Sequence, residues 1–150
     1  MAGEMIKPGP DDPAFWVSLI MALWDFPKPI VGAINGLGVG GGANMALANC
    51  MDLVVCSTNA RFKYPFSTLG LTPELGSSQL IPFIVGMAKA KEIMMIGDWI
   101  AADKAVSLGL ANEVVAPDAL LARAMEVATD LTTRKQPVCP SIPPGPREGI

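Results

Sequence analysis

A run of glycines directly after a short apolar segment is the feature that most restricts how this chain can fold. Residues 29–34 (PIVGAI) contain β-branched side chains and predict a strand. Residues 35–42 (NGLGVGGG) follow it, and five of these eight residues are glycine. Glycine permits backbone conformations that other residues avoid and lets neighbouring groups approach closely. Residues 43–49 (ANMALAN) predict a short helix, so we expect a strand, a loop and a helix in succession.

The other apolar segments alternate between strand and helix patterns. Residues 53–56 (LVVC) form an unbroken apolar run, which is typical of a strand buried on both faces. Further extended segments are expected at residues 61–64 and 111–115. Helices are expected over residues 13–25, 77–86, 87–96, 101–108 and 117–131, the second of them interrupted by Pro82. The pattern predicts an α/β fold with parallel strands and flanking helices in one domain, residues 1–131, followed by a proline-rich, disordered tail, residues 132–150.

Composition excludes several classes of function. The chain has 150 residues, no histidine and three cysteines, so triads that need an imidazole, histidine-ligated metals and a disulfide framework are not expected. Proton chemistry near neutral pH therefore falls to a carboxylate, lysine, tyrosine or cysteine. The net charge is −3 and the basic residues are scattered, which argues against nucleic acid. No apolar stretch is long enough for a bilayer, and we expect a cytoplasmic protein, or one of an organelle matrix in a eukaryote.

The glycine run allows three interpretations. Gly36, Gly38 and Gly41 match the spacing of the dinucleotide-binding fingerprint, but that fold also needs an acidic residue at the far end of the next strand. Asp52 stands at the near end of that strand instead. The run could also be a structural turn. The third interpretation is a loop whose N–H groups face an anion or oxyanion at the start of a helix.

Glu74 is the carboxylate that stands out, in the segment 69–78 (LGLTPELGSS). In the simplest interpretation Thr72 caps a helix, Pro73 is its first residue and Glu74 is a first-turn carboxylate that the helix dipole favours. In the functional interpretation, the apolar side chains around Glu74 desolvate it, raise its pKa and make it a usable base or acid, against the dipole. These neighbours are Phe66, Leu69, Leu71, Leu75 and Leu80.

Several motifs in a fixed order resemble the crotonase, or enoyl-CoA hydratase/isomerase, superfamily. The resemblance covers roughly residues 28–131 and implies a partial crotonase-like ββα core. It also implies that the chain is truncated, because the leading strands and C-terminal helices of the family are not matched. The matching segments are 28–30 (KPI), 35–42 (NGLGVGGG), 50–53 (CMDL), 60–66 (ARFKYPF), 69–78 (LGLTPELGSS), 97–98 (GD), 101–105 (AADKA) and 109–115 (GLANEVV).

The resemblance implies a binding site for acyl-coenzyme A thioesters. Members of the family hold the thioester carbonyl between two backbone N–H groups, which the resemblance places at Gly41 and at Glu4. The resemblance implies no separate cofactor, since coenzyme A is part of the substrate, and no metal. It also implies a homo-oligomer, a trimer or hexamer. Other residues expected to bind the substrate are Gly40, Gly42, Phe66, Leu71 and Pro73.

The placement of carboxylates suggests which reaction the chain would catalyse. The resemblance places the two glutamates of the hydratases at Asn44 and Phe66 of this sequence, which implies that the usual acid and base pair is missing. Glu74 alone, in a Pro-Glu-x-x-Ser-Ser context, resembles the Δ3,Δ2-enoyl-CoA isomerase branch. We therefore expect an enzyme that shifts a 3-enoyl double bond to the 2-position. The alternatives are a non-catalytic acyl-CoA-binding or assembly module of the same fold, and an enoyl-CoA hydratase.

Overall fold

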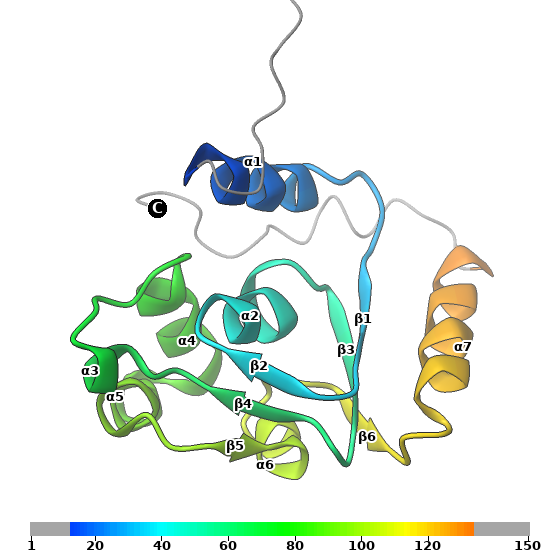
Figure 1. The fold of residues 1–150 in the computed structure, drawn as a ribbon. Helices are drawn as coiled ribbons and strands as arrows, with labels where there is room; N and C mark the ends of the chain where they lie inside the picture. Colours follow the sequence, from blue (N-terminus) through cyan, green and yellow to red (C-terminus); the bar gives the residue numbers. More distant parts are fainter. Residues whose placement is uncertain (1–12, 134–150) are drawn as a thin grey trace, which may run out of the picture.

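Two three-stranded sheets form the centre of the structure, a computed structural model that describes residues 13–133 (Figure 1). The first sheet has the order β1 (Val31–Ile34), β3 (Leu53–Ser57) and β6 (Glu113–Val115), and its strands are all parallel. The second has the order β2 (Leu37–Val39), β4 (Arg61–Lys63) and β5 (Ile100–Ala101). In it β2 and β4 are parallel, whereas β4 and β5 are antiparallel. The α/β fold with parallel strands is thus confirmed, and antiparallel β5 is an addition to it.

The middle strand of the first sheet, β3, has the double-sided burial that its sequence predicts. Val54, Val55, Cys56 and Ser57 are all buried, with neighbouring strands on both sides and α7 (Leu120–Thr133) packed against β1 and β3 (Figure 1). The unbroken apolar run over residues 53–56 suits a strand that is covered on both faces.

Helices surround the sheets at the expected places, with shifted ends. α7 begins at Leu120 rather than at Pro117, because residues 117–119 form a turn, and Pro82 lies inside α4 without ending it. None of the helices within residues 13–133 is long and apolar enough to cross a membrane. The other helices are α1 (Pro13–Trp24), α2 (Gly41–Asn44) with the π-helical turn η1 (Met45–Asn49), α3 (Phe66–Leu69), α4 (Ser77–Val85), α5 (Met87–Ile96) and α6 (Ala102–Ser107).

Two short elements lie where the sequence predicted only loop. β2 falls inside the glycine run, where Gly38 is opposite Phe62 of β4. Its pairing partner is more than twenty residues away, so the three-residue strand has no local pattern that reveals it. The one-turn helix α3 lies between the expected extended segment 61–64 and the expected helix 77–86, and it is followed by Gly70, which has a left-handed conformation. β2 adds backbone hydrogen bonds to the glycine run, and α3 adds them just before the segment that carries Glu74.

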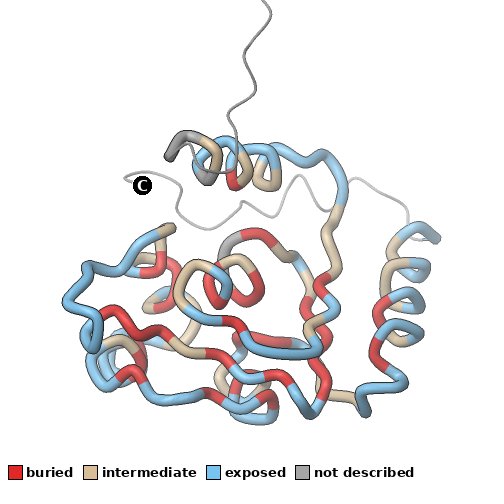
Figure 2. The backbone as a smooth tube through the Cα atoms, in the orientation of Figure 1, coloured by how far each residue is buried: buried red, intermediate tan, exposed pale blue. Residues whose placement is uncertain are grey.

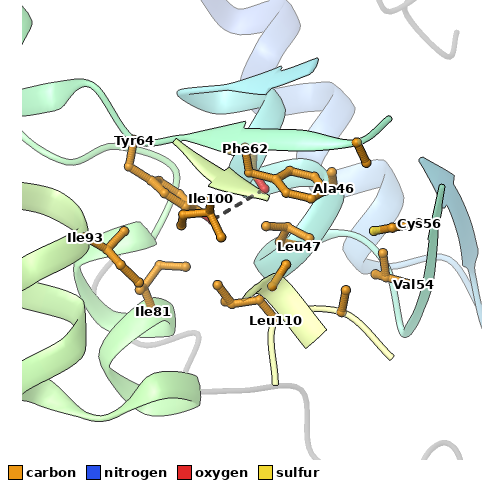
Figure 3. Packing of buried hydrophobic residues seen from close by; sticks show 14 of the residues in the cluster. Ala46, Leu47, Val54, Cys56, Phe62, Tyr64, Ile81, Ile93, Ile100 and Leu110 are labelled. Carbon is orange, nitrogen blue, oxygen red and sulfur yellow. Dashed lines mark hydrogen bonds between the residues drawn. The ribbon is translucent and has the colours of Figure 1, made fainter. Parts of the chain in front are cut away.

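The core lies between the second sheet and the helices beneath it (Figure 3). Phe62, Tyr64 and Ile81 are fully buried there, and Figure 2 shows buried residues both along the strands and on the helices around them. The Tyr64 hydroxyl donates to the Ala43 carbonyl at 3.5 Å, drawn as a dashed line in Figure 3. Burial raises the pKa of this phenol, so it stays a neutral donor. The core thereby holds α2, and with it the glycine run, against β4.

Candidate active site

The glycine run turns sharply from β2 into α2 and brings the start of that helix to the protein surface. Gly40, with φ of 54°, precedes the helix, and its N–H donates to the Lys63 carbonyl at 2.9 Å. The Gly40 carbonyl accepts from the Asn44 N–H at 3.0 Å. The first N–H groups of any helix lack acceptors within the helix, so those of Gly41 and Gly42 are placed to bind an anion or a polarised carbonyl.

Close packing explains two of the glycines. A Cβ on Gly38 would lie 3.0 Å from Phe62 Cδ1 and 3.4 Å from the Ala43 Cα. A Cβ on Gly41 would lie 3.0 Å from Leu75 Cδ1 and 3.7 Å from Glu74 Oε1. Gly41 and the Glu74 carboxylate, the predicted oxyanion donor and proton carrier, are therefore neighbours in space.

The dinucleotide interpretation has no support at Asp52. Its carboxylate Oδ2 accepts from the Ile30 N–H at 2.7 Å, at the near end of β3, as the sequence placed it. It thereby fixes the entry of the chain into β1 and is turned toward the backbone rather than toward the glycine run.

The segment that carries Glu74 differs from the predicted cap. Thr72 does not begin a helix; residues 71–74 have no regular secondary structure, and α4 begins only at Ser77, with Gly76 before it. Leu75 has φ of 50° and Gly76 has φ of 72°, so two left-handed residues turn the chain ahead of the helix. The interpretation of Glu74 as a first-turn carboxylate is therefore wrong.

The other interpretation, in which apolar neighbours desolvate the Glu74 carboxylate, is also wrong within residues 13–133. Glu74 is exposed, and two of the apolar residues expected to cover it are exposed as well, Leu69 at 64% and Leu71 at 58%. Phe66 and Leu80 are buried, but they belong to the core below. The sequence pattern correctly placed leucines near Glu74 in the chain but could not show that they point to solvent.

The main-chain carbonyl of Glu74 is held by three hydrogen bonds. It accepts from Asn44 Nδ2 at 3.0 Å, from the Ser77 N–H at 3.0 Å and from Ser77 Oγ at 2.7 Å. Asn44 and Ser77 are both fully buried. The backbone of the turn is thus fixed from below while the carboxylate is exposed above it.

An apolar groove of about 320 Å³ lies beside this turn. Phe66, Leu71 and Pro73, three of the residues expected to bind substrate, line it together. Pro73 directly precedes Glu74, so the groove borders the turn that carries Glu74. The remaining lining residues come from α3, α4 and α5; these are Ser67, Ser78, Pro82, Met87, Ala90, Lys91, Met94 and Met95.

The contribution of α5 to the groove was missed by sequence reasoning. Met87, Ala90, Lys91 and Met94 recur at helical spacing and lie along one side of α5. That periodicity was visible in the sequence, but a helix with apolar residues on several sides does not reveal which side borders a groove. Methionine side chains adapt to irregular apolar ligands, which suits a groove for a flexible chain.

Three further observations concern Glu4, the cysteines and the metal-ligating side chains. Glu4, the expected second oxyanion donor, lies outside the described residues. Cys50 and Cys56 are buried free thiols, as expected for small core residues, and burial raises the pKa of Cys56 to about 11. Within residues 13–133 no group of three or more His, Cys, Asp or Glu side chains could hold a metal ion.

The fold and the sequence both match one family. The sequence profile of the family described as enoyl-CoA hydratase/isomerase matches residues 13–139, so this chain belongs to the enoyl-CoA hydratase/isomerase family. It is 38% identical to the crotonyl-CoA hydratase of Syntrophomonas wolfei over 109 residues, 73% of this chain and 41% of that protein. It is 34% identical to the 1,2-epoxyphenylacetyl-CoA isomerase of Escherichia coli over 120 residues, 80% of this chain and 45% of that protein.

A solved structure gives the same result. The crystal structure of an enoyl-CoA hydratase/isomerase from Pseudoalteromonas atlantica superposes with a TM-score of 0.76 at 34% identity, covering 85% of this chain and 50% of that one. The chain therefore spans about half the length of the relatives that it matches. The crotonase resemblance of the sequence is confirmed.

Proposed function

We propose that this chain carries the proton-transfer site of an enoyl-CoA isomerase that converts a 3-enoyl thioester into the conjugated 2-enoyl thioester. The observation that carries the proposal is the approach of Glu74 Oε1 to within 3.7 Å of the Cβ position on Gly41. It sets a carboxylate beside the N–H groups at the start of α2. Membership of the enoyl-CoA hydratase/isomerase family supports an acyl-CoA thioester as the substrate.

In the proposed reaction Glu74 is the catalytic residue. Its carboxylate takes a proton from C2 of the substrate, and the C2–H bonding electrons move into the thioester to form an enolate. The Gly41 N–H, and that of Glu4 as the second donor, stabilise the negative charge on the oxygen; one such donor contributes about 3 to 4 kcal/mol in enzymes of known mechanism. The enolate then takes the proton back from Glu74 at C4, the double bond lies between C2 and C3, and no net proton is consumed.

The residues at the two positions of the hydratase glutamates favour isomerisation over hydration. Asn44 and Phe66 are both buried and neither carries a carboxylate, so they supply no acid and base pair to activate water. The hydratase remains the second candidate, because the relative from Syntrophomonas wolfei is named a crotonyl-CoA hydratase. The acyl chain would lie in the groove beside Glu74, and the working unit would be a homo-oligomer without a further cofactor.

The test is turnover of a 3-enoyl-CoA by the chain, followed by the absorbance of the conjugated product. We expect turnover by the parent and a loss of about 100-fold or more in kcat for Glu74→Gln, the usual range for a removed general base. Glu126→Gln is the matched control, because Glu126 lies on α7, where it pairs with Arg123. Parental turnover by Glu74→Gln would refute the mechanism.

The same assay separates the alternatives. Hydration of a 2-enoyl-CoA, seen as a loss of that absorbance, at a rate above isomerisation would identify a hydratase. Thermal stabilisation by acyl-CoA without either reaction would identify a binding or assembly module.

A further inference from the structure

Asn44 connects α2, the helix at the end of the glycine run, to the turn that carries Glu74. It stands at the end of α2 and is thirty positions from Glu74 in the chain, yet its Nδ2 donates to the Glu74 carbonyl at 3.0 Å. The Glu74 carbonyl oxygen and Asn44 Oδ1 are both acceptors, so only the amide nitrogen of Asn44 can face the carbonyl. The orientation of the Asn44 side chain is therefore fixed by chemistry.

This orientation leaves the other end of the side chain unpaired. Asn44 is 0% exposed, and within the described part of the chain its Oδ1 has no hydrogen-bond partner. A buried acceptor without a partner destabilises the fold, so an aliphatic side chain would suit core packing better at this place. Asparagine at this place supplies one thing that an aliphatic residue cannot, the hydrogen bond to the Glu74 carbonyl.

The turn that Asn44 contacts is strained. Leu75, directly after Glu74, has φ of 50°, a conformation that costs free energy for a residue with a Cβ and persists only where the surroundings hold it. Ser77 supplies two of the bonds to the Glu74 carbonyl, but it lies only three residues further on and moves with the same turn. Asn44 supplies the bond that comes from the helix of the glycine run.

We propose that Asn44 is a positioning residue that fixes the Glu74 turn at its working distance from Gly41. This inference rests on the proposed function for its catalytic meaning. Asn44 does not touch the reacting atoms. It joins α2, whose first N–H groups would bind the oxyanion, to the turn whose carboxylate would move the proton. The distance between Gly41 and Glu74 is thereby kept constant.

The test compares Asn44→Asp with Asn112→Asp. Asn44 acts as a donor, and the aspartate carboxylate would lose the bond and repel the Glu74 carbonyl. Asn112 acts as an acceptor, with its Oδ1 taking the Val54 N–H at 2.7 Å, so the same change there keeps its bond. We expect kcat of Asn44→Asp with 3-enoyl-CoA to fall about 10- to 100-fold with KM within about twofold, and Asn112→Asp to match the parent.

A second variant covers the case in which the buried charge prevents folding. Asn44→Leu has the same branched shape and removes the unpaired Oδ1, so it should fold with nearly parental stability while losing the donor. We expect it to lower kcat as Asn44→Asp does. Parental kcat in Asn44→Leu would overturn the proposal, as would an equal loss in Asn112→Asp.

Amide hydrogen exchange keeps this test separate from that of the proposed function. The Ser77 N–H donates to the Glu74 carbonyl, so a loosened turn exposes it to solvent. We expect faster exchange at Ser77 in Asn44→Leu than in Asn112→Asp, whether or not the chain turns over a 3-enoyl-CoA. If the parent is inactive, the proposed function fails, and the exchange result alone decides whether Asn44 holds the turn. Equal exchange at Ser77 in the two variants would refute that role.

Discussion

Replacing Gly41 by alanine tests the spacing between the glycine run and Glu74. The added Cβ would lie 3.0 Å from Leu75 Cδ1, whereas carbon atoms in contact prefer about 3.5 to 4.0 Å, so Leu75 must move by roughly half an ångström or more. Leu75 directly follows Glu74 in a strained turn, and the new atom would itself lie 3.7 Å from Glu74 Oε1, so the change crowds both residues beside Gly41. The change therefore disturbs the site without removing any N–H donor.

Two opposing effects set the cost of this change for stability. Alanine favours a helix over glycine by about 1 kcal/mol, and overpacking costs about 1 to 3 kcal/mol. Leu75 is only partly buried and can give way, so we expect a net loss of about 1 kcal/mol, or roughly 2 to 4 °C in Tm for a chain of this size. A shift of up to about 1 Å in a catalytic group can lower turnover about 100-fold, so we expect kcat to fall 10- to 100-fold.

Gly36→Ala is the control for both measurements. A Cβ on Gly36 would meet no heavy atom within 4 Å, and Gly36 lies in the exposed link between β1 and β2. We expect its Tm and its turnover of 3-enoyl-CoA to match those of the parent. The reasoning would be refuted if Gly41→Ala kept the parental kcat, or if Gly36→Ala lost as much activity as Gly41→Ala.

Two further predictions concern the core. Gly38→Ala should lower the free energy of unfolding by about 1 to 3 kcal/mol in urea titration, because its Cβ would press on Phe62 and on the Ala43 backbone; an unchanged midpoint would contradict this packing. Burial raises the pKa of Cys56 from 9.0 to about 11 and raises that of Cys50 as well, so the folded chain holds protons that the unfolded chain releases. Stability should be retained below pH 9 and fall as pH rises from 9 to 11, by about 3 kcal/mol at most from Cys56; a urea midpoint that rises between pH 8 and 10.5 would oppose this sign.

The local sequence determined most elements of the chain and the chemistry available to it. The apolar run of β3, the helical segments and the glycine run each have a period or composition that acts over a few residues, so their class and approximate place are visible without a structure. The absence of histidine limits acid–base chemistry to other side chains, and among these the sequence singled out Glu74 by its apolar neighbours in the chain.

Only the tertiary structure decided how distant segments meet. The pairing of β2 with β4, the bond from Asn44 to Glu74 and the side of α5 that borders the groove all join residues far apart in the chain. It also decided that Glu74 is exposed, against the expectation from its leucine neighbours. Exposure and spacing depend on which surfaces pack together, and that packing is a property of the whole fold rather than of any short segment.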